Sequence, residues 1–277
     1  MNRIDELFKR KRESVLSIYF TAGYPELNDT VHIISGLEKA GADLIEIGFP
    51  FSDPVADGPV IQASSHRALE NGMNLDILFE QLSGIKATSS IPKIMMGYFN
   101  TVYQYGIDHF ISKCATSGVD GVIIPDLPPE VYEREYRQLF EAAGLHVIFL
   151  VAPQTNPERA EYLETLTKGF LYRLSMSGTT GNAIAGDETW GKRSNGKPVL
   201  IGFGIHDHAT FELACRHANG AIIGTGFIRH LATLEEDRLS KKKIDGRKKD
   251  RETKERSEDR GREIAEICKG FIQKIRS

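Results

Sequence analysis

Residues 43–62 read DLIEIGFPFSDPVADGPVIQ, and this stretch decides how the whole chain is interpreted. It begins as a short aliphatic strand, Leu44–Ile47, with one acidic residue, Glu46, inside it. It continues as a loop that holds Asp53 and Asp57 among glycines and prolines, which bend and stiffen a chain. An acidic residue in a buried strand is costly unless it is paired or functional, so this stretch indicates an active site.

The alternative for Glu46 is an outward-facing side chain that pairs with a surface lysine. Its neighbours on both sides are aliphatic, which is typical of a parallel strand buried on both faces. We therefore favour a functional carboxyl group at the carboxyl end of this strand.

Short aliphatic strands alternate with amphipathic segments along most of the chain, after a leading helix with Ile4, Leu7 and Phe8 on one face. Such alternation predicts a parallel sheet, and eight units in a chain of 277 residues predict an α/β fold, a (β/α)8 TIM barrel in a single domain with an extra N-terminal helix. A doubly wound sheet is the alternative, but residues 21–25 lack its dinucleotide fingerprint. Strands are predicted at 15–20, 44–47, 92–98, 121–125, 146–151, 170–174, 198–203 and 220–224. Helices are predicted at 28–40, 60–71, 75–87, 107–117, 130–143, 157–167, 207–217 and from 227.

Composition excludes several classes of protein. The net charge of −3 gives no reason to expect nucleic acid or an anionic membrane as a partner. Three scattered cysteines, Cys114, Cys215 and Cys268, are typical of reduced thiols in a cytoplasmic protein rather than of a zinc site. No apolar run reaches the length of a membrane span, and the charged N-terminus lacks the apolar core of a secretion signal.

Glycine-rich turns follow the last two predicted strands, Gly202–Ile205 after one and Gly224–Gly226 after the other. Glycines allow backbone N–H groups to approach an anion, and a helix that begins after Thr225 adds its N-terminus. Phosphate binding after these two strands recurs in TIM barrels, so we expect a phosphate site rather than simple tight turns.

Apolar and aromatic residues also gather at the predicted strand ends. In a barrel these ends face one mouth, so the residues there form a flat, largely uncharged pocket. The pocket suits an aromatic substrate with a phosphate tail. Its predicted members are Tyr19, Met96, Tyr98, Ile123 and Phe203.

The segment EIGFPFSDPVADGP, residues 46–59, resembles the hallmark of the tryptophan synthase alpha subunit family, a strand glutamate followed by G-x-P-F-S-D-P-x-A-D-G-P. The resemblance extends from about residue 4 to residue 234. It implies a lyase of tryptophan biosynthesis that cleaves indole-3-glycerol phosphate to indole and glyceraldehyde 3-phosphate by a retro-aldol reaction.

The resemblance also implies roles for individual residues. Glu46 transfers the proton, in surroundings formed by Ile45, Ile47 and aromatic residues that favour its protonated form. Asp57 accepts a hydrogen bond from the indole N–H and stabilises the cationic intermediate. Tyr172 is an auxiliary group, and the phosphate is held by Gly181, Gly204, Gly224 and Thr225.

A long Gly/Ser/Thr-rich connection, residues 175–196, is expected to act as a lid or to be disordered. In the family this segment is a lid, and Thr180 meets the acidic loop near Asp57. Relatives usually have arginine where this chain has Met176, which removes an ionic contact. Trp190 lies in the same segment and is a natural reporter of its motion.

The family acts with a partner, the tryptophan synthase beta subunit, in an α2β2 heterotetramer. The pyridoxal phosphate cofactor belongs to that partner, so this chain is expected to need neither a cofactor nor a metal. The implied contacts lie at Pro50, Asp53, Asn100 and Pro128.

Rival functions remain open at this stage. A Schiff-base aldolase needs a lysine at a strand's carboxyl end, and a metal aldolase needs clustered histidines and carboxylates; the sequence favours neither. A phosphosugar isomerase on the same fold would not need the SDPVADGP loop. A non-catalytic subunit that regulates another chain is the alternative from a different class.

Composition changes sharply after the barrel. We expect residues 1–234 to form the catalytic barrel, the charged residues 235–262 to be a disordered or solvated helical insert outside the resemblance, and residues 263–277 to form a helix that docks on the barrel. Ile264, Ile267, Phe271 and Ile275 form the apolar stripe of that helix.

Overall fold

The structure is a computed structural model that describes residues 2–175, 196–233 and 253–277. Within these ranges nine parallel strands form one sheet, in the order β5-β4-β3-β2-β1-β9-β8-β7-β6. The strands are β1 (Val15–Thr21), β2 (Leu44–Gly48), β3 (Lys93–Met96), β4 (Gly121–Ile123), β5 (His146–Val147), β6 (Leu150–Val151), β7 (Leu171–Leu174), β8 (Val199–Gly202) and β9 (Gly220–Ile223).

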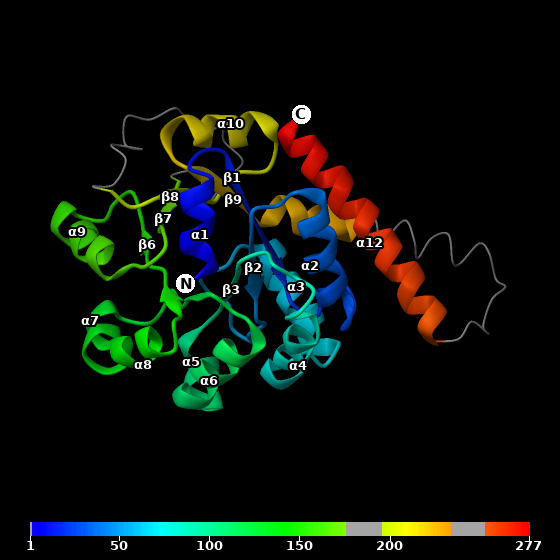
Figure 1. Cartoon of the computed structure of the whole chain (residues 1–277), viewed down its shortest axis with the longest axis horizontal. Helices are drawn as coiled ribbons and strands as arrows, with labels where there is room; N and C mark the ends of the chain where they lie inside the picture. Colours follow the sequence, from blue (N-terminus) through cyan, green and yellow to red (C-terminus); the bar gives the residue numbers. More distant parts are fainter. Residues whose placement is uncertain (1, 176–195, 234–252) are drawn as a thin grey trace.

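The strands β5 and β6 are two halves of the single strand predicted at 146–151. The first half pairs with β4 and the second with β7, and only Ile148 and Phe149 separate them. The Phe149 N–H donates to the Thr167 hydroxyl (2.7 Å) instead of continuing the ladder. The strands β5 and β6 stand at the two ends of the strand order, and the short segment 148–149 joins them, so the sheet closes into a barrel. The predicted TIM barrel is confirmed (Figure 1).

Alternate residues of each strand face the barrel interior and the surrounding helices. The interior cluster includes Leu44, Ile94, Ile123 and Leu200, and the helix α1 (Arg3–Arg10) closes it at the amino ends of the strands with Ile4, Leu7 and Phe8. Figure 1 shows α1 inside the ring of outer helices. This end of the barrel is sealed, so the site lies at the other end.

The outer helices are α2 (Asp29–Ala40), α3 (Pro59–Glu70), α4 (Leu75–Ile85), α5 (Phe99–Tyr105), α6 (Ile107–Ser117), α7 (Pro129–Val131), a π-helical turn η1 (Tyr132–Tyr136), α8 (Arg137–Ala142), α9 (Pro157–Leu166) and α10 (His208–His217). Residues 225–233 are also helical. The single helix predicted at 130–143 is thus interrupted by a π-helical turn. The helix α5 was not predicted; its first N–H, from Phe99, donates to Asp126 (2.8 Å), a residue far away in the sequence.

The last helix, α12 (Thr253–Arg276), begins ten residues earlier than the predicted boundary at 263. It lies along α2, as Figure 1 shows. Arg260 is buried and pairs through two nitrogens with the equally buried Asp29 (2.9 and 2.6 Å). Residues 253–262 are therefore helical, which agrees with the second of the two alternatives for the charged insert, while residues 234–252 lie outside the described ranges.

Two further sequence expectations can be compared with the structure. The cysteines Cys114, Cys215 and Cys268 are all free. Among the helices of the described ranges, none combines the length and the apolar character needed to cross a membrane.

Candidate active site at the barrel mouth

A cavity of about 260 Å³ opens at the carboxyl ends of the strands. Its lining is mainly aromatic and aliphatic, with Asp57 as its charged member within the described residues. Phe51 and Tyr98 stack with ring centroids 5.1 Å apart on one side. The remaining lining comes from Tyr19, Thr21, Phe49, Pro54, Ala56, Ile61, Ser65, Met96, Gly97, Pro125, Leu150, Leu174 and Phe203.

Glu46 points into the barrel interior and is fully buried. Its Oε1 accepts a hydrogen bond from the Ser17 hydroxyl (2.9 Å), and its Oε2 has no hydrogen-bond partner among the described residues. Burial raises the pKa of Glu46 to about 8, because a charged carboxylate loses its hydration there, while the bond from Ser17 opposes the shift. Glu46 is therefore protonated at neutral pH.

Tyr19 separates Glu46 from the cavity. The two residues are partners in the β1–β2 register, and Gly48 is the next inward position above Glu46 on β2. A Cβ atom at Gly48 would collide with the Tyr19 hydroxyl, so this side chain crosses from β1 to β2 and occupies that space. Glu46 does not line the cavity, and Tyr19 forms the floor above it.

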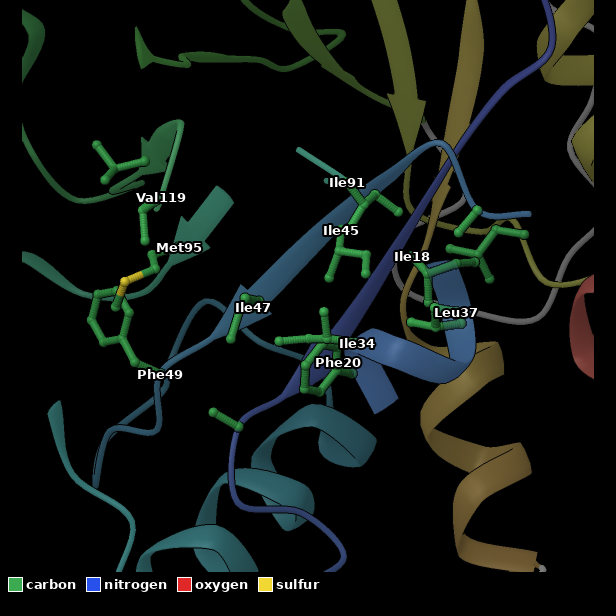
Figure 2. Close-up of a cluster of buried hydrophobic side chains, with 14 of the residues drawn as sticks. Ile18, Phe20, Ile34, Leu37, Ile45, Ile47, Phe49, Ile91, Met95 and Val119 are labelled. Carbon is green, nitrogen blue, oxygen red and sulfur yellow. The ribbon is translucent and has the colours of Figure 1, made fainter. Parts of the chain in front are cut away.

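Ile45 and Ile47 do not surround the Glu46 carboxyl, which corrects the expectation from the sequence. Figure 2 shows both with Ile18, Phe20 and Ile34 in the cluster between the sheet and α2. Neighbouring strand residues face opposite sides of a sheet, so the residues that desolvate Glu46 come from the barrel interior instead.

Asp57 occupies the opposite side of the site, in the loop after β2. Its Oδ2 accepts a hydrogen bond from the Tyr98 hydroxyl (2.9 Å), which in turn accepts from the Ala56 N–H (3.0 Å). Burial raises the pKa of Asp57, and the bond from Tyr98 opposes that shift. Burial is the main cause of the raised pKa of Tyr19, and the charges of Asp57 and Glu46 raise it further, so this tyrosine lies within electrostatic range of both acids.

The predicted phosphate glycines lie at the edge of the cavity. Gly204 directly follows Phe203, which lines the cavity. Gly224 packs against Tyr19, where a Cβ atom would lie 3.1 Å from the ring, and the Gly224 carbonyl accepts the Ile228 N–H (3.0 Å) at the start of a helix. The first N–H groups of a helix have no partner within it, so Thr225 stands at a position suited to an anion.

A family model described as tryptophan synthase alpha chain matches residues 6–258. This chain belongs to that family. The match continues past residue 234, where the resemblance was expected to end.

The alpha chain of Flavobacterium johnsoniae is 51% identical over 239 residues, which cover 84% of this chain and 94% of that one. The alpha chain of Bacteroides thetaiotaomicron is 47% identical over 253 residues, 88% of this chain and 97% of that one. A crystal structure of the alpha chain from Legionella pneumophila superposes with a TM-score of 0.81 at 31% identity, covering 99% of this chain and 97% of that one. A tryptophan synthase complex from Pyrococcus furiosus matches with a TM-score of 0.76 at 30% identity, covering 95% and 98% of the two chains.

The site residues expected for an alpha chain that lie within the described ranges are found at two depths. Tyr19, Met96, Tyr98 and Phe203 line the cavity. Ile123 and Tyr172 lie deeper, in the interior cluster. Thr180, Gly181 and the lid residues Met176 and Trp190 lie outside the described residues.

The expected partner contacts surround the mouth. Asp53, Asn100 and Pro128 are exposed, whereas Pro50 is buried. Two exposed apolar side chains accompany them, Val55 (86% exposed) in the loop and Tyr103 (61% exposed) on α5.

Ser17 is the residue that sequence reasoning missed. It is fully buried, and it faces inward at the level of Leu44. The signal was available: a lone polar residue in the apolar strand VLSIYF, two positions before Tyr19 and so on the same face. In the ranges that the structure describes, no three His, Cys, Asp or Glu side chains are grouped as metal ligands would be.

Proposed function

We propose that this chain is the alpha subunit of tryptophan synthase and cleaves indole-3-glycerol phosphate to indole and glyceraldehyde 3-phosphate. The observation that carries the proposal is membership of the alpha chain family, together with an aromatic cavity at the barrel mouth that Asp57 lines and that has Glu46 buried beneath its floor. The cavity offers stacking surfaces for an indole ring, chiefly the Phe51 and Tyr98 pair.

Glu46 donates the proton in this proposal. Carbon–carbon cleavage requires protonation of indole C3 and loss of the proton from the adjacent side-chain hydroxyl, so that the bond breaks to leave indole and an aldehyde. Glu46 becomes a carboxylate when it protonates C3, and this carboxylate then accepts the hydroxyl proton, which returns Glu46 to its protonated form. With a pKa raised to about 8, Glu46 carries the required proton at neutral pH. Because Tyr19 covers it, the carboxyl group has to turn toward the mouth when substrate binds.

Asp57 stabilises the intermediate. Protonation at C3 leaves positive charge on the indole ring, and a carboxylate that accepts the ring N–H stabilises this charge most strongly in a site shielded from water. The Tyr98 hydroxyl keeps Asp57 oriented and favours its ionised form. Tyr172 is proposed as an auxiliary group, since it lies close enough to Glu46 for their charges to interact.

The phosphate tail is proposed to bind Gly204, Gly224 and Thr225, with Gly181 completing the site. The position of these turns at the cavity edge supports this assignment. Glycines allow close approach of the backbone, and the helix at 225–233 offers its N-terminus to the phosphate.

The proposed partner is the beta subunit, which holds the pyridoxal phosphate in an α2β2 assembly. Exposed Val55 and Tyr103, beside the expected contacts at Asp53 and Asn100, support a protein interface around the mouth. A partner seated there would receive indole directly from the cavity. We propose a cytoplasmic location, which the free cysteines support.

The decisive experiment measures indole release from indole-3-glycerol phosphate by the purified chain, alone and with a beta subunit. Slow release alone that rises strongly with the partner is expected. A folded chain that releases no indole under either condition would contradict the proposal and would favour a regulatory subunit or another phosphorylated substrate.

A further inference from the structure

The turn after β8 has an unusual backbone conformation at Phe203. Its φ angle is 69°, in the left-handed region that bulky residues rarely adopt, and Gly204 follows with a φ angle of 74°. A glycine takes up this conformation without steric cost, but a phenylalanine does not. Such a residue persists only where its surroundings hold it in place, and Phe203 lies at the edge of the cavity.

Ser175, directly after β7, provides this hold. Its hydroxyl donates to the Phe203 carbonyl (2.6 Å), and its N–H donates to the Gly202 carbonyl (3.0 Å). Only 6% of the Ser175 surface is exposed, so the hydroxyl is shielded from competing water. Two successive carbonyls at the end of β8 are therefore bonded to one residue at the end of β7.

This pair of bonds breaks the alternation of a regular strand. Successive carbonyls of a strand between two parallel neighbours point to one neighbour and then to the other. The Val199 carbonyl accepts from Asn219, just before β9, and the Gly202 carbonyl accepts from Ser175, on the β7 side. In a continued strand the next carbonyl, that of Phe203, would point to β9. In the left-handed conformation it points to β7 instead.

The direction of the Gly204 N–H follows from this reversal. The Phe203 carbonyl and the Gly204 N–H belong to one planar trans peptide unit, in which the two groups point in opposite directions. With the carbonyl held on the β7 side, the N–H faces the side of β9, and the turn at 224–225 directly follows that strand. Within the described ranges no backbone carbonyl accepts this N–H.

We propose that Ser175 is a positioning residue of the phosphate site. Its hydroxyl holds Phe203 in the left-handed conformation that directs the Gly204 N–H toward the turn at 224–225, so that both turns present donors to one anion. The inference rests on the proposed function, which supplies a phosphate ester as the ligand. Ser175 acts on that ligand through the peptide unit between Phe203 and Gly204.

Loss of the Ser175 hydroxyl should weaken the binding of a phosphate group but not that of the indole ring. Without the bond, this peptide unit is free to leave the left-handed conformation, and the Gly204 N–H loses its direction. The stacking surface for indole comes chiefly from Phe51 and Tyr98, which the bond does not touch. A role limited to general stability would instead weaken the binding of both ligands.

The test compares Ser175→Ala with Ser175→Thr, which keeps the hydroxyl. Calorimetric titration of the purified chain with inorganic phosphate and with indole measures the two affinities separately. Steady-state cleavage in the complex with the beta subunit gives KM and kcat. Ser83→Ala, which removes a serine hydroxyl that bonds α4 to α6 (3.0 Å), is the matched control.

For Ser175→Ala we expect the dissociation constant of inorganic phosphate and the KM of the substrate to rise about fivefold, the effect of one misaligned hydrogen bond. The dissociation constant of indole and kcat should stay unchanged, because an interaction made equally in the ground state and the transition state affects KM alone. Ser175→Thr and Ser83→Ala should resemble the wild type.

Two outcomes would overturn the role of Ser175. Unchanged affinity for inorganic phosphate in a folded Ser175→Ala means that the bond does not direct the Gly204 N–H. An equal loss of affinity for phosphate and indole means that Ser175 maintains the mouth as a whole. Failure of the proposed function gives a different result, because the wild type then releases no indole while the phosphate titrations still separate Ser175→Ala from Ser175→Thr.

Discussion

The two ends of the barrel both bury charged side chains, but among the described residues a buried carboxyl oxygen without a hydrogen-bond partner occurs only at the mouth. At the closed end, Asp120 accepts from the Arg3 guanidinium (2.8 Å) and from the Lys93 backbone N–H (2.8 Å). The Lys93 ammonium group donates to the carbonyls of Ser89 (3.3 Å) and Ile91 (3.2 Å). At the mouth, Glu46 has one bonded oxygen and one without a partner among the described residues.

This difference separates structural charges from functional ones. Buried charges that satisfy each other hold elements together, and here they fasten α1 and β3 to the turn before β4. A buried acid with an unpaired oxygen contributes little to stability and is retained for its chemistry. Substitutions at the closed end should therefore reduce stability, and substitutions at the mouth should reduce the rate.

The largest expected effect is that of Glu46→Gln. The amide fits the same space but has no proton to transfer, so kcat should fall by about 10²–10⁴ with the free energy of unfolding maintained. The measurement is single-turnover cleavage in the beta-subunit complex. Glu70→Gln, on the exposed face of α3, is the matched control and should behave as the wild type. Normal turnover by Glu46→Gln would mean that the buried acid at the mouth has no catalytic role, and the two ends would then not differ in function.

Asp120→Ala should have the opposite effect, with a lower free energy of unfolding and an unchanged kcat. It leaves the Arg3 guanidinium and the buried Lys93 backbone N–H without their acceptor, which should lower the free energy of unfolding by about 3 kcal/mol, as measured by urea denaturation. Below its unfolding temperature the variant should keep its kcat. Asp5→Ala, which removes the more exposed partner of His146, serves as the control and should cost less than about 1 kcal/mol. A large fall in kcat for folded Asp120→Ala would contradict the claim that the closed end contributes to stability and not to the rate.

Tyr98→Phe sharpens the comparison within the mouth. It deletes the hydroxyl that links Asp57 to the Ala56 N–H, so kcat should fall by about fivefold, the equivalent of one hydrogen bond of about 1 kcal/mol. Tyr162→Phe, which removes a hydroxyl that donates to the exposed Glu133 (2.7 Å), is the control for loss of a tyrosine hydroxyl. Equal rates for the two variants would remove the orienting role assigned to Tyr98.

The last prediction concerns the pH dependence of the free energy of unfolding, for which the two ends should respond in opposite directions. The folded-state pKa of Glu46 is raised from 4.5 to about 8, so the folded state binds the extra proton and stability is lost as pH rises through this window. Burial lowers the pKa of Lys93 from 10.5 to about 8, so stability is lost as pH falls from 10.5 through 8.

Urea denaturation across pH 5 to 10 tests both slopes. In Glu46→Gln the free energy of unfolding should not decline as pH rises toward 8. In Lys93→Met the free energy of unfolding should not rise as pH increases above 8. If the free energies of unfolding of Glu46→Gln and the wild type differ by the same amount at every pH in this range, Glu46 does not titrate as described.

The sequence was a good guide wherever local pattern decides structure. The alternation of strands and helices predicted the barrel, and the lone acid in LIEI predicted the buried Glu46. Prediction from the sequence failed where a residue far away in the chain determines the local structure. Asp126 caps α5, the Thr167 hydroxyl divides the fifth strand, and Asp29 draws the charged start of α12 onto the barrel through Arg260.

The surroundings of Glu46 illustrate the same limit. Sequence neighbours Ile45 and Ile47 face the outer helices, and the residues that matter, Ser17 and Tyr19, come from the neighbouring strand. Strand periodicity gives the side of the sheet that a residue faces, but only the register between strands gives what it meets there.

The most direct test of a protonated Glu46 at the mouth is infrared spectroscopy of the carboxyl C=O stretch in the wild type and in Glu46→Gln. The wild type should show a buried protonated carboxyl band at pH 6 to 7 that disappears as pH rises through about 8, and Glu46→Gln should lack it. Absence of the band from the wild type at pH 6 would mean that Glu46 is ionised in the folded protein, which would contradict its role as the proton donor.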